Sequence, residues 1–147
     1  MQRPKLSDDA GSASLEFITA GVLLLVPLVY LVLAISSVQS ATFAVEGSAR
    51  QAARVFVTSD TVDQAYGRAD QAIAFGLSDY GLQRDRAQVS VDCLSGTCLE
   101  PDSLVSVNVT VNVPLPLVPP VLGLQQLASV PVTSSSTAHV SRFHGGV

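Results

Sequence analysis

A long uncharged stretch near the amino terminus constrains this chain more than any other feature. No charged residue lies between Glu16 and Glu46, and residues 17–38 read FITAGVLLLVPLVYLVLAISSV. About 20 apolar residues in a helix cross the hydrocarbon core of a bilayer, so this stretch is long enough to form a membrane-spanning helix. A secretory signal peptide is the alternative. Its apolar region usually has about 7–15 residues and ends at a small-residue cleavage site, whereas no clean site of that kind follows before Gln39.

Basic residues on the two flanks indicate the orientation of this span. Arg3 and Lys5 precede the apolar stretch, together with the terminal amine, whereas Arg50 and Arg54 lie further from it on the other side. Lys and Arg close to a span favour the cytoplasmic side. The sequence therefore predicts a single-pass membrane protein with a cytoplasmic amino terminus and an extracytoplasmic carboxy-terminal part.

The two cysteines, Cys93 and Cys98, flank a short turn-like segment in the sequence CLSGTC. A disulfide is favoured outside the cytoplasm, and the alternative is a pair of free thiols. A zinc site needs two further ligands, and the only histidines are His139 and His144. A redox motif has the spacing C-x-x-C, which differs from the spacing here.

Two helices are predicted before the cysteines. The first runs from about Ser14 to Phe56, with Pro27 expected to bend it, and an apolar stripe continues along it beyond the span: Phe43, Ala49, Ala52, Ala53 and Phe56. The second follows the N-cap candidates Thr58, Ser59 and Asp60 and presents one apolar face: Val62, Ala65, Tyr66, Ala69 and Ile73. Gly76 and Gly81 are candidates for its end.

Alternation of apolar and polar residues predicts three strands after these helices. The first includes Val89, Val91 and Cys93, and the second includes the valines at 105, 107, 109, 111 and 113. We expect these two strands to form an antiparallel hairpin, with the disulfide in the loop that connects them. A third strand is predicted over Ser129–Phe143, with four inward residues: Val130, Val132, Ala138 and Val140. The apolar, proline-rich segment 114–122 is either a loop folded over the sheet edge or an exposed contact surface. The predicted fold is α+β, with the second helix packed on the sheet.

Composition narrows the classes of function. The formal net charge is −4 and no basic patch is present, so a nucleic-acid partner is not expected. The sequence contains no Gly-rich phosphate loop, H-E-x-x-H or G-x-S-x-G. No nucleophile, base and orienting group cluster in it, so we predict neither catalytic residues nor a cofactor or metal, and expect a protein that is not an enzyme.

The residues that precede the span resemble those of a known family. A short basic leader, Gly11, four residues, then Glu16-Phe17 and an apolar helix resemble a class III prepilin-like sequence of the tight-adherence (Tad) pilus system. The size and the predicted α+β region resemble the TadE/TadG-like minor pilins, or pseudopilins, and the composition resembles actinobacterial members. The resemblance is specific over residues 12–56 and architectural beyond them. It implies cleavage by a prepilin peptidase between Gly11 and Ser12, and a need for Glu16 and the adjacent Phe17 in assembly.

Electrostatics supports such a role for Glu16 independently. A cut after Gly11 would leave an amine on Ser12, and the Glu16 carboxylate of one subunit could pair with the amine of a neighbour. Burial of either charge alone costs several kcal/mol, and pairing recovers much of that.

The sequence therefore divides into a leader (1–11), a transmembrane and extended helix (12–56) and an extracytoplasmic head (57–147). The predicted function is a pilin-like structural subunit in assembly of a Tad-type, type IV-related pilus. Its expected partners are the membrane, other pilin subunits, the prepilin peptidase and the inner-membrane assembly platform. The alternative is a permanent single-pass membrane protein whose head binds or senses a ligand.

Overall fold

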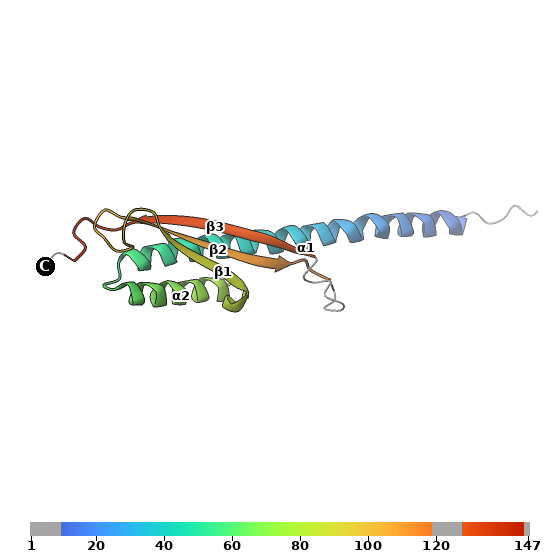
Figure 1. Ribbon diagram of the computed structural model, residues 1–147. Helices are drawn as coiled ribbons and strands as arrows, with labels where there is room; N and C mark the ends of the chain where they lie inside the picture. The colour runs from blue at the N-terminus through green and yellow to red at the C-terminus, as the bar shows by residue number, and fades with distance from the viewer. Residues whose placement is uncertain (1–9, 119–127, 146–147) are drawn as a thin grey trace, which may run out of the picture.

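The computed structural model describes residues 10–118 and 128–145, with the backbone alone for residues 10–12. The elements follow in the order α1 (Ala10–Val57), α2 (Val62–Ser78), η1 (Arg84–Arg86), β1 (Ala87–Cys93), β2 (Leu104–Pro114) and β3 (Ser129–His139). The strands form one antiparallel sheet in the order β1-β2-β3. Figure 1 shows both helices alongside this sheet, with the amino-terminal half of α1 extending away from it. The predicted α+β fold is confirmed.

The carboxy-terminal half of α1 forms one wall of the core. Its buried residues recur every three or four positions, as one face of an α-helix requires: Ala41, Ala44, Val45, Ser48, Ala49, Ala52, Ala53 and Phe56. The prediction that Phe43 belongs to this stripe is wrong, because its side chain is 62% exposed. At about 100° per residue, Phe43 lies about 120° around the helix from Ala49.

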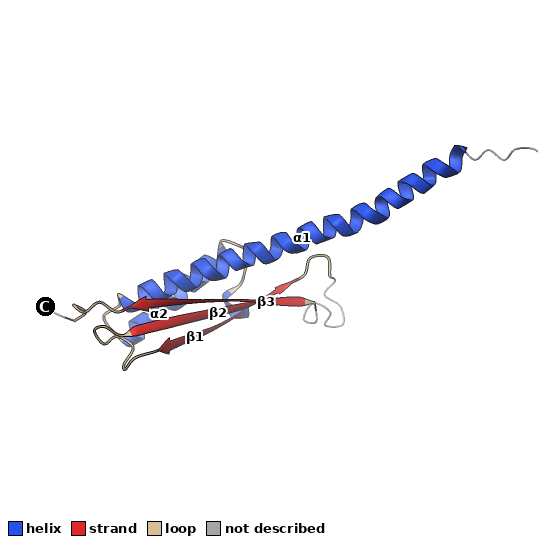
Figure 2. Cartoon of the chain, turned by 90° about the horizontal axis from the view of Figure 1, so that it is seen from above, coloured by secondary structure: helices blue, strands red, loops and turns tan. Residues whose placement is uncertain are grey.

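The whole of α1 is one helix, and it continues through Pro27. Figure 2 shows it as a continuous and gently curved element without a break. The predicted bounds, Ser14 to Phe56, are confirmed to within a few residues. Proline removes one backbone hydrogen-bond donor from a helix, and α1 nevertheless continues through Pro27 without ending.

The ends of α2 differ from the prediction. The N-cap is Thr61, whose hydroxyl accepts a hydrogen bond from the Gln64 N–H at 3.3 Å, so the N-cap lies just after the predicted candidates 58–60. The helix continues past Gly76 to Ser78. Asp79 is the C-cap, and Gly81, with a φ of +70°, lies in the turn that follows, a conformation that glycine adopts readily.

The face that α2 turns to the core is narrower than predicted. Ala65, Ala69 and Ile73 are buried, together with Leu77, whereas the exposed fractions of Val62 and Tyr66 are 41% and 47%. The Tyr66 ring nevertheless packs edge-on against Phe56 of α1, with ring centroids 5.2 Å apart. Val89 and Val91 of β1 lie with Ala69 and Ile73 around one small hollow, which places α2 against that strand as predicted.

Strand β2 lies at the centre of the sheet and supplies most of its buried side chains. Its valines at 105, 107, 109, 111 and 113 are buried, as the alternation predicts. The intervening residues carry polar contacts on the other face, including Ser106 Oγ with Ser135 Oγ at 3.1 Å and Thr110 Oγ1 with Thr133 Oγ1 at 2.9 Å. The register pairs Val109 with both Val89 and Ser134.

Strand β3 is shorter than predicted. It ends at His139, which pairs with Leu104 at the start of β2. Because β2 begins at Leu104, residues after His139 have no residue of β2 to pair with. Phe143 lies in a turn, and 79% of its surface is exposed. Val132 and Val140 are buried and Ala138 is half-buried, as predicted, but Val130 is 36% exposed at the end of this edge strand.

Candidate functional site

The free half of α1 is the dominant exposed apolar surface of the described residues. The large aliphatic and Phe side chains from Leu15 to Ile35 have exposed fractions between 44% and 80%. From Ala13 onward, α1 is long and apolar enough to cross a membrane. Soluble monomers rarely expose contiguous apolar patches larger than a few hundred Å². This surface is therefore suited to lipid or to the apolar faces of other helices.

Glu16 lies at the start of this surface and on its own. Its side chain is exposed and borders a shallow hollow with Leu15, Thr19 and Leu23. The Thr19 hydroxyl donates to the Leu15 carbonyl oxygen at 2.8 Å, so it is already engaged. Glu16 forms no ion pair with any residue that the structure describes. The next residue, Phe17, is 80% exposed.

The predicted cleavage position lies in the first turn of α1. The backbone of Gly11 and Ser12 is helical, and Ser12 precedes Glu16 by four residues, so the two positions share one face of the helix. Helix ends fray, and a cut at this bond would disturb only the first turn. The new amine would then lie one turn from the Glu16 carboxylate.

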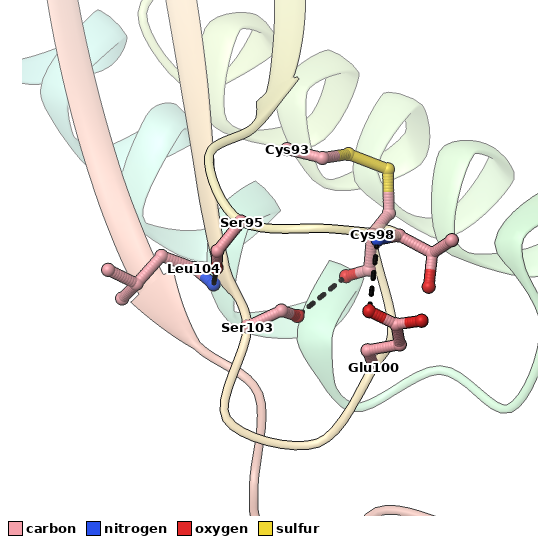
Figure 3. The surroundings of a disulfide bond; sticks show 7 residues. Cys93, Ser95, Cys98, Glu100, Ser103 and Leu104 are labelled. Carbon is pink, nitrogen blue, oxygen red and sulfur yellow. Dashed lines mark hydrogen bonds between the residues drawn. A yellow bond between two sulfur atoms is a disulfide. The ribbon is translucent and has the colours of Figure 1, made fainter.

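The two cysteines form a disulfide in the loop that connects β1 to β2. Their Cα atoms are 5.0 Å apart, and Figure 3 shows the bond closing the loop at the end of β1. The Ser95 hydroxyl accepts a hydrogen bond from the Leu104 N–H at 3.1 Å, and the Ser103 hydroxyl donates to the Cys98 carbonyl oxygen at 3.4 Å. The predicted disulfide is confirmed, and these bonds show that it fixes a structured loop.

A groove separates α1 from α2. It has a volume of about 690 Å³, and residues of both helices line it, among them Gln51, Arg68, Gln71 and Phe75. Phe75 is 76% exposed. At one point the helices approach closely, because a Cβ on Gly76 would lie 2.4 Å from Ser48 Oγ. The close approach therefore requires glycine at position 76, which lies inside α2 and not at its end.

The structure does not bring the predicted site residues together. Gly11, Ser12 and Glu16 lie at the free end of α1, and the disulfide loop lies at the opposite end of the molecule (Figure 1). Within the described ranges, no group of three or more His, Cys, Asp or Glu side chains is placed to hold a metal ion.

The position of Leu117 beside α1 was not predicted from the sequence. Leu117, in the segment after β2, lies beside Pro27 and Tyr30 of α1. A signal for it exists in the sequence, because no Asp, Glu, Lys or Arg lies between Asp102 and Arg142. That signal marks an unusual segment but does not say what it contacts.

No protein-family model, curated protein or solved structure matches this chain. The resemblance of residues 12–56 to Tad pilus proteins therefore stays a prediction.

Proposed function

We propose that this chain is a membrane-anchored, pilin-like structural subunit of the TadE/TadG-like minor pilin class, without enzymatic activity, that takes part in assembling a Tad-type pilus. The observation that carries this proposal is the division of α1. One half supplies the core of a small head, and the other half projects with its apolar side chains exposed. A single helix that continues from a head into lipid can also pass into a bundle of identical helices, because both environments are apolar.

Two features support an anchor with the head outside the cytoplasm. The basic residues Arg3 and Lys5 precede the span, and Lys and Arg favour the cytoplasmic side. The head carries the Cys93–Cys98 disulfide, and disulfides persist mainly in oxidising compartments. Both features favour a head on the extracytoplasmic side of the membrane.

Glu16 distinguishes an assembly subunit from a simple anchor. In an isolated span its carboxylate can reach the headgroup region at little cost. A subunit packed among other helices loses that access to water, and its carboxylate then needs a partner charge. The amine created on Ser12 by cleavage would supply that charge from a neighbouring subunit, and the pairing would favour one axial register.

The test is to replace Glu16 and to measure the protein in the membrane and in sheared pili of its own host. We expect Glu16→Ala to leave membrane insertion intact and to reduce recovery in pili strongly. Glu16→Asp should be intermediate because its shorter side chain reaches a neighbouring amine less well. Glu46→Ala is the matched control, since Glu46 is a carboxylate on the same helix that pairs with Arg50 one turn away. An exposed pair of this kind contributes only about 0.3–0.5 kcal/mol.

The outcomes separate the two classes of function. Equal recovery of wild type and Glu16→Ala in pili would refute the assembly role of this carboxylate. Recovery of no variant in pili, wild type included, would favour a permanent membrane protein with a binding or sensing head. The groove between α1 and α2, with exposed Phe75 on its border, is the observation that favours this second candidate.

A further inference from the structure

The chain that leaves β2 returns toward the apolar half of α1. That strand ends at Pro114 and residues 115–118 follow it, and Figures 1 and 2 show this end of the sheet directed toward the free half of α1. Leu117 lies with residues 25–30 of α1 around a hollow of about 480 Å³. Part of the head therefore lies beside the predicted membrane span rather than beyond its end.

Leu117 combines a strained backbone with an exposed apolar side chain. Its φ is 65°, in the left-handed region that is unfavourable for a residue with a Cβ atom. Its side chain is 78% exposed, so packing within the described part of the head does not account for this conformation. Residues in such conformations persist only where the surrounding structure imposes them, and they cluster at functional sites.

The position of Leu117 along α1 defines its depth. Ser36, Ser37 and Gln39 are the first polar residues after the apolar centre of the span, and they mark its outer end. Tyr30 lies six residues before Ser36, which is about 9 Å at about 1.5 Å per residue. The apolar faces of interfacial helices are buried about 5–10 Å into the boundary between headgroups and acyl chains, which is comparable to this depth.

The chemistry of the segment is compatible with this depth. Unpaired backbone donors are costly in lipid, but Pro114 and Pro116 have no N–H to pair. The Leu115 N–H donates to the Ala128 carbonyl oxygen at 2.9 Å. The charge-free sequence between Asp102 and Arg142 includes this segment, so its insertion would bury no formal charge.

We propose that Pro114–Val118 is a second membrane contact, which inserts Leu117 into the bilayer leaflet on the side of the head, next to Tyr30. The partner is lipid, because the residues of α1 that surround Leu117 belong to the predicted span. Two contacts, the span and this segment, would fix the rotation of the head about the axis of α1. The inference depends on the proposed insertion of α1 and specifies how the head sits on the bilayer.

The chain contains no tryptophan, so a single introduced tryptophan reports on its own environment. We would reconstitute full-length Leu117→Trp in vesicles of phosphatidylcholine and phosphatidylglycerol, with and without brominated acyl chains. Val29→Trp is the reference for the span. Phe143→Trp is the control for an exposed apolar position, since Phe143 is 79% exposed and lies beyond the end of β3 at His139, whereas Pro114 pairs with Ser129 at the start of that strand.

The expected result is a blue-shifted emission of Leu117→Trp and a loss of intensity in brominated vesicles comparable to that of Val29→Trp. Phe143→Trp should keep an emission typical of water and be quenched by aqueous acrylamide. If Leu117→Trp misfolds, as judged by circular dichroism, Leu115→Trp reports on the same segment and must be quenched by brominated lipid.

Three results would overturn the inference. A water-like emission from the segment, with Val29→Trp quenched by lipid, would refute the second contact and leave the span intact. A blue shift without lipid quenching would show that protein, for example a second copy of the chain, covers Leu117. Failure of Val29→Trp to be quenched would remove the membrane span itself, and the inference with it.

Discussion

The contact between Gly76 of α2 and Ser48 of α1 provides the sharpest test of the packing in the head. A Cβ added to Gly76 would lie 2.4 Å from Ser48 Oγ and 3.3 Å from Ser48 Cα and Cβ. Gly67 is a matched control on the same helix, because a Cβ added there meets no atom within 4 Å. The two Gly→Ala substitutions therefore change the same chemical group in opposite environments.

The expected magnitudes follow from these distances. In an exposed helix interior, Ala is favoured over Gly by about 1 kcal/mol, so Gly67→Ala should stabilise the head by about that amount. Gly76→Ala has the same helical gain but forces atoms into a filled space, which typically costs about 1–3 kcal/mol. We therefore expect Gly76→Ala to be less stable than Gly67→Ala by about 1–3 kcal/mol.

Replacement of Ser48 tests whether this contact is the cause. Ser48 Oγ is buried and has no hydrogen-bond partner among the described residues. An unsatisfied buried hydroxyl costs about 1–3 kcal/mol, so Ser48→Ala alone should stabilise the head. It also removes the atom nearest to the new Cβ, and in that background the difference between Gly76→Ala and Gly67→Ala should fall by at least about half.

The assay is thermal unfolding of the full-length chain in detergent, followed by near-ultraviolet circular dichroism. The edge-on contact between Tyr66 and Phe56, at 5.2 Å, joins the same two helices and should contribute to that signal. A difference of 1 kcal/mol corresponds to about 4–8 °C in Tm for a domain of about 60–100 residues. Equal stability of Gly76→Ala and Gly67→Ala would refute the close approach. A difference that Ser48→Ala leaves unchanged would show that another contact causes it.

Two further predictions concern the disulfide and the leader. Replacement of both Cys93 and Cys98 by Ser should lower the Tm of the head without abolishing its fold. The loop that the disulfide closes is short, so the disulfide should stabilise the head by an amount near the lower end of about 2–4 kcal/mol. Two freely alkylated thiols in non-reduced, natively exported protein would contradict the disulfide. With the cognate peptidase present, mass spectrometry should find a mature chain that starts at Ser12, and Gly11→Val should abolish this cut. Gly21→Val is the control, since the space around Gly21 is open and processing should continue. An intact amino terminus on wild-type protein from its own host would refute the predicted cleavage.

The amino-acid sequence by itself determined the features that depend on neighbouring residues. The apolar stretch after Glu16 predicts the free half of α1, because hydropathy and helix length are local properties. The alternation of valines from 105 to 113 predicts β2 and its buried face for the same reason. The spacing of Cys93 and Cys98 predicts their disulfide, since a turn between them brings the two residues close together.

The tertiary structure decided the features that depend on distant residues. The way in which the sheet packs against α1 leaves Phe43 exposed, although its apolar side chain fits the apolar stripe that the sequence predicts along this helix. A glycine at position 76 fits a helix end when the sequence alone is considered, whereas the structure shows that α2 continues through it and that Ser48 of α1 leaves no room there for a side chain. Strand β3 stops at His139 because its pairing partner begins at Leu104.

The position of Leu117 beside Tyr30 shows the same limit most clearly. Local composition marks residues 114–118 as apolar and proline-rich, and both a loop over the sheet edge and a contact surface agree with it. Only the direction in which β2 runs along α1 places this segment next to the span. Backbone direction is set by the packing of the sheet on α1 as a whole, so no short stretch of sequence encodes it.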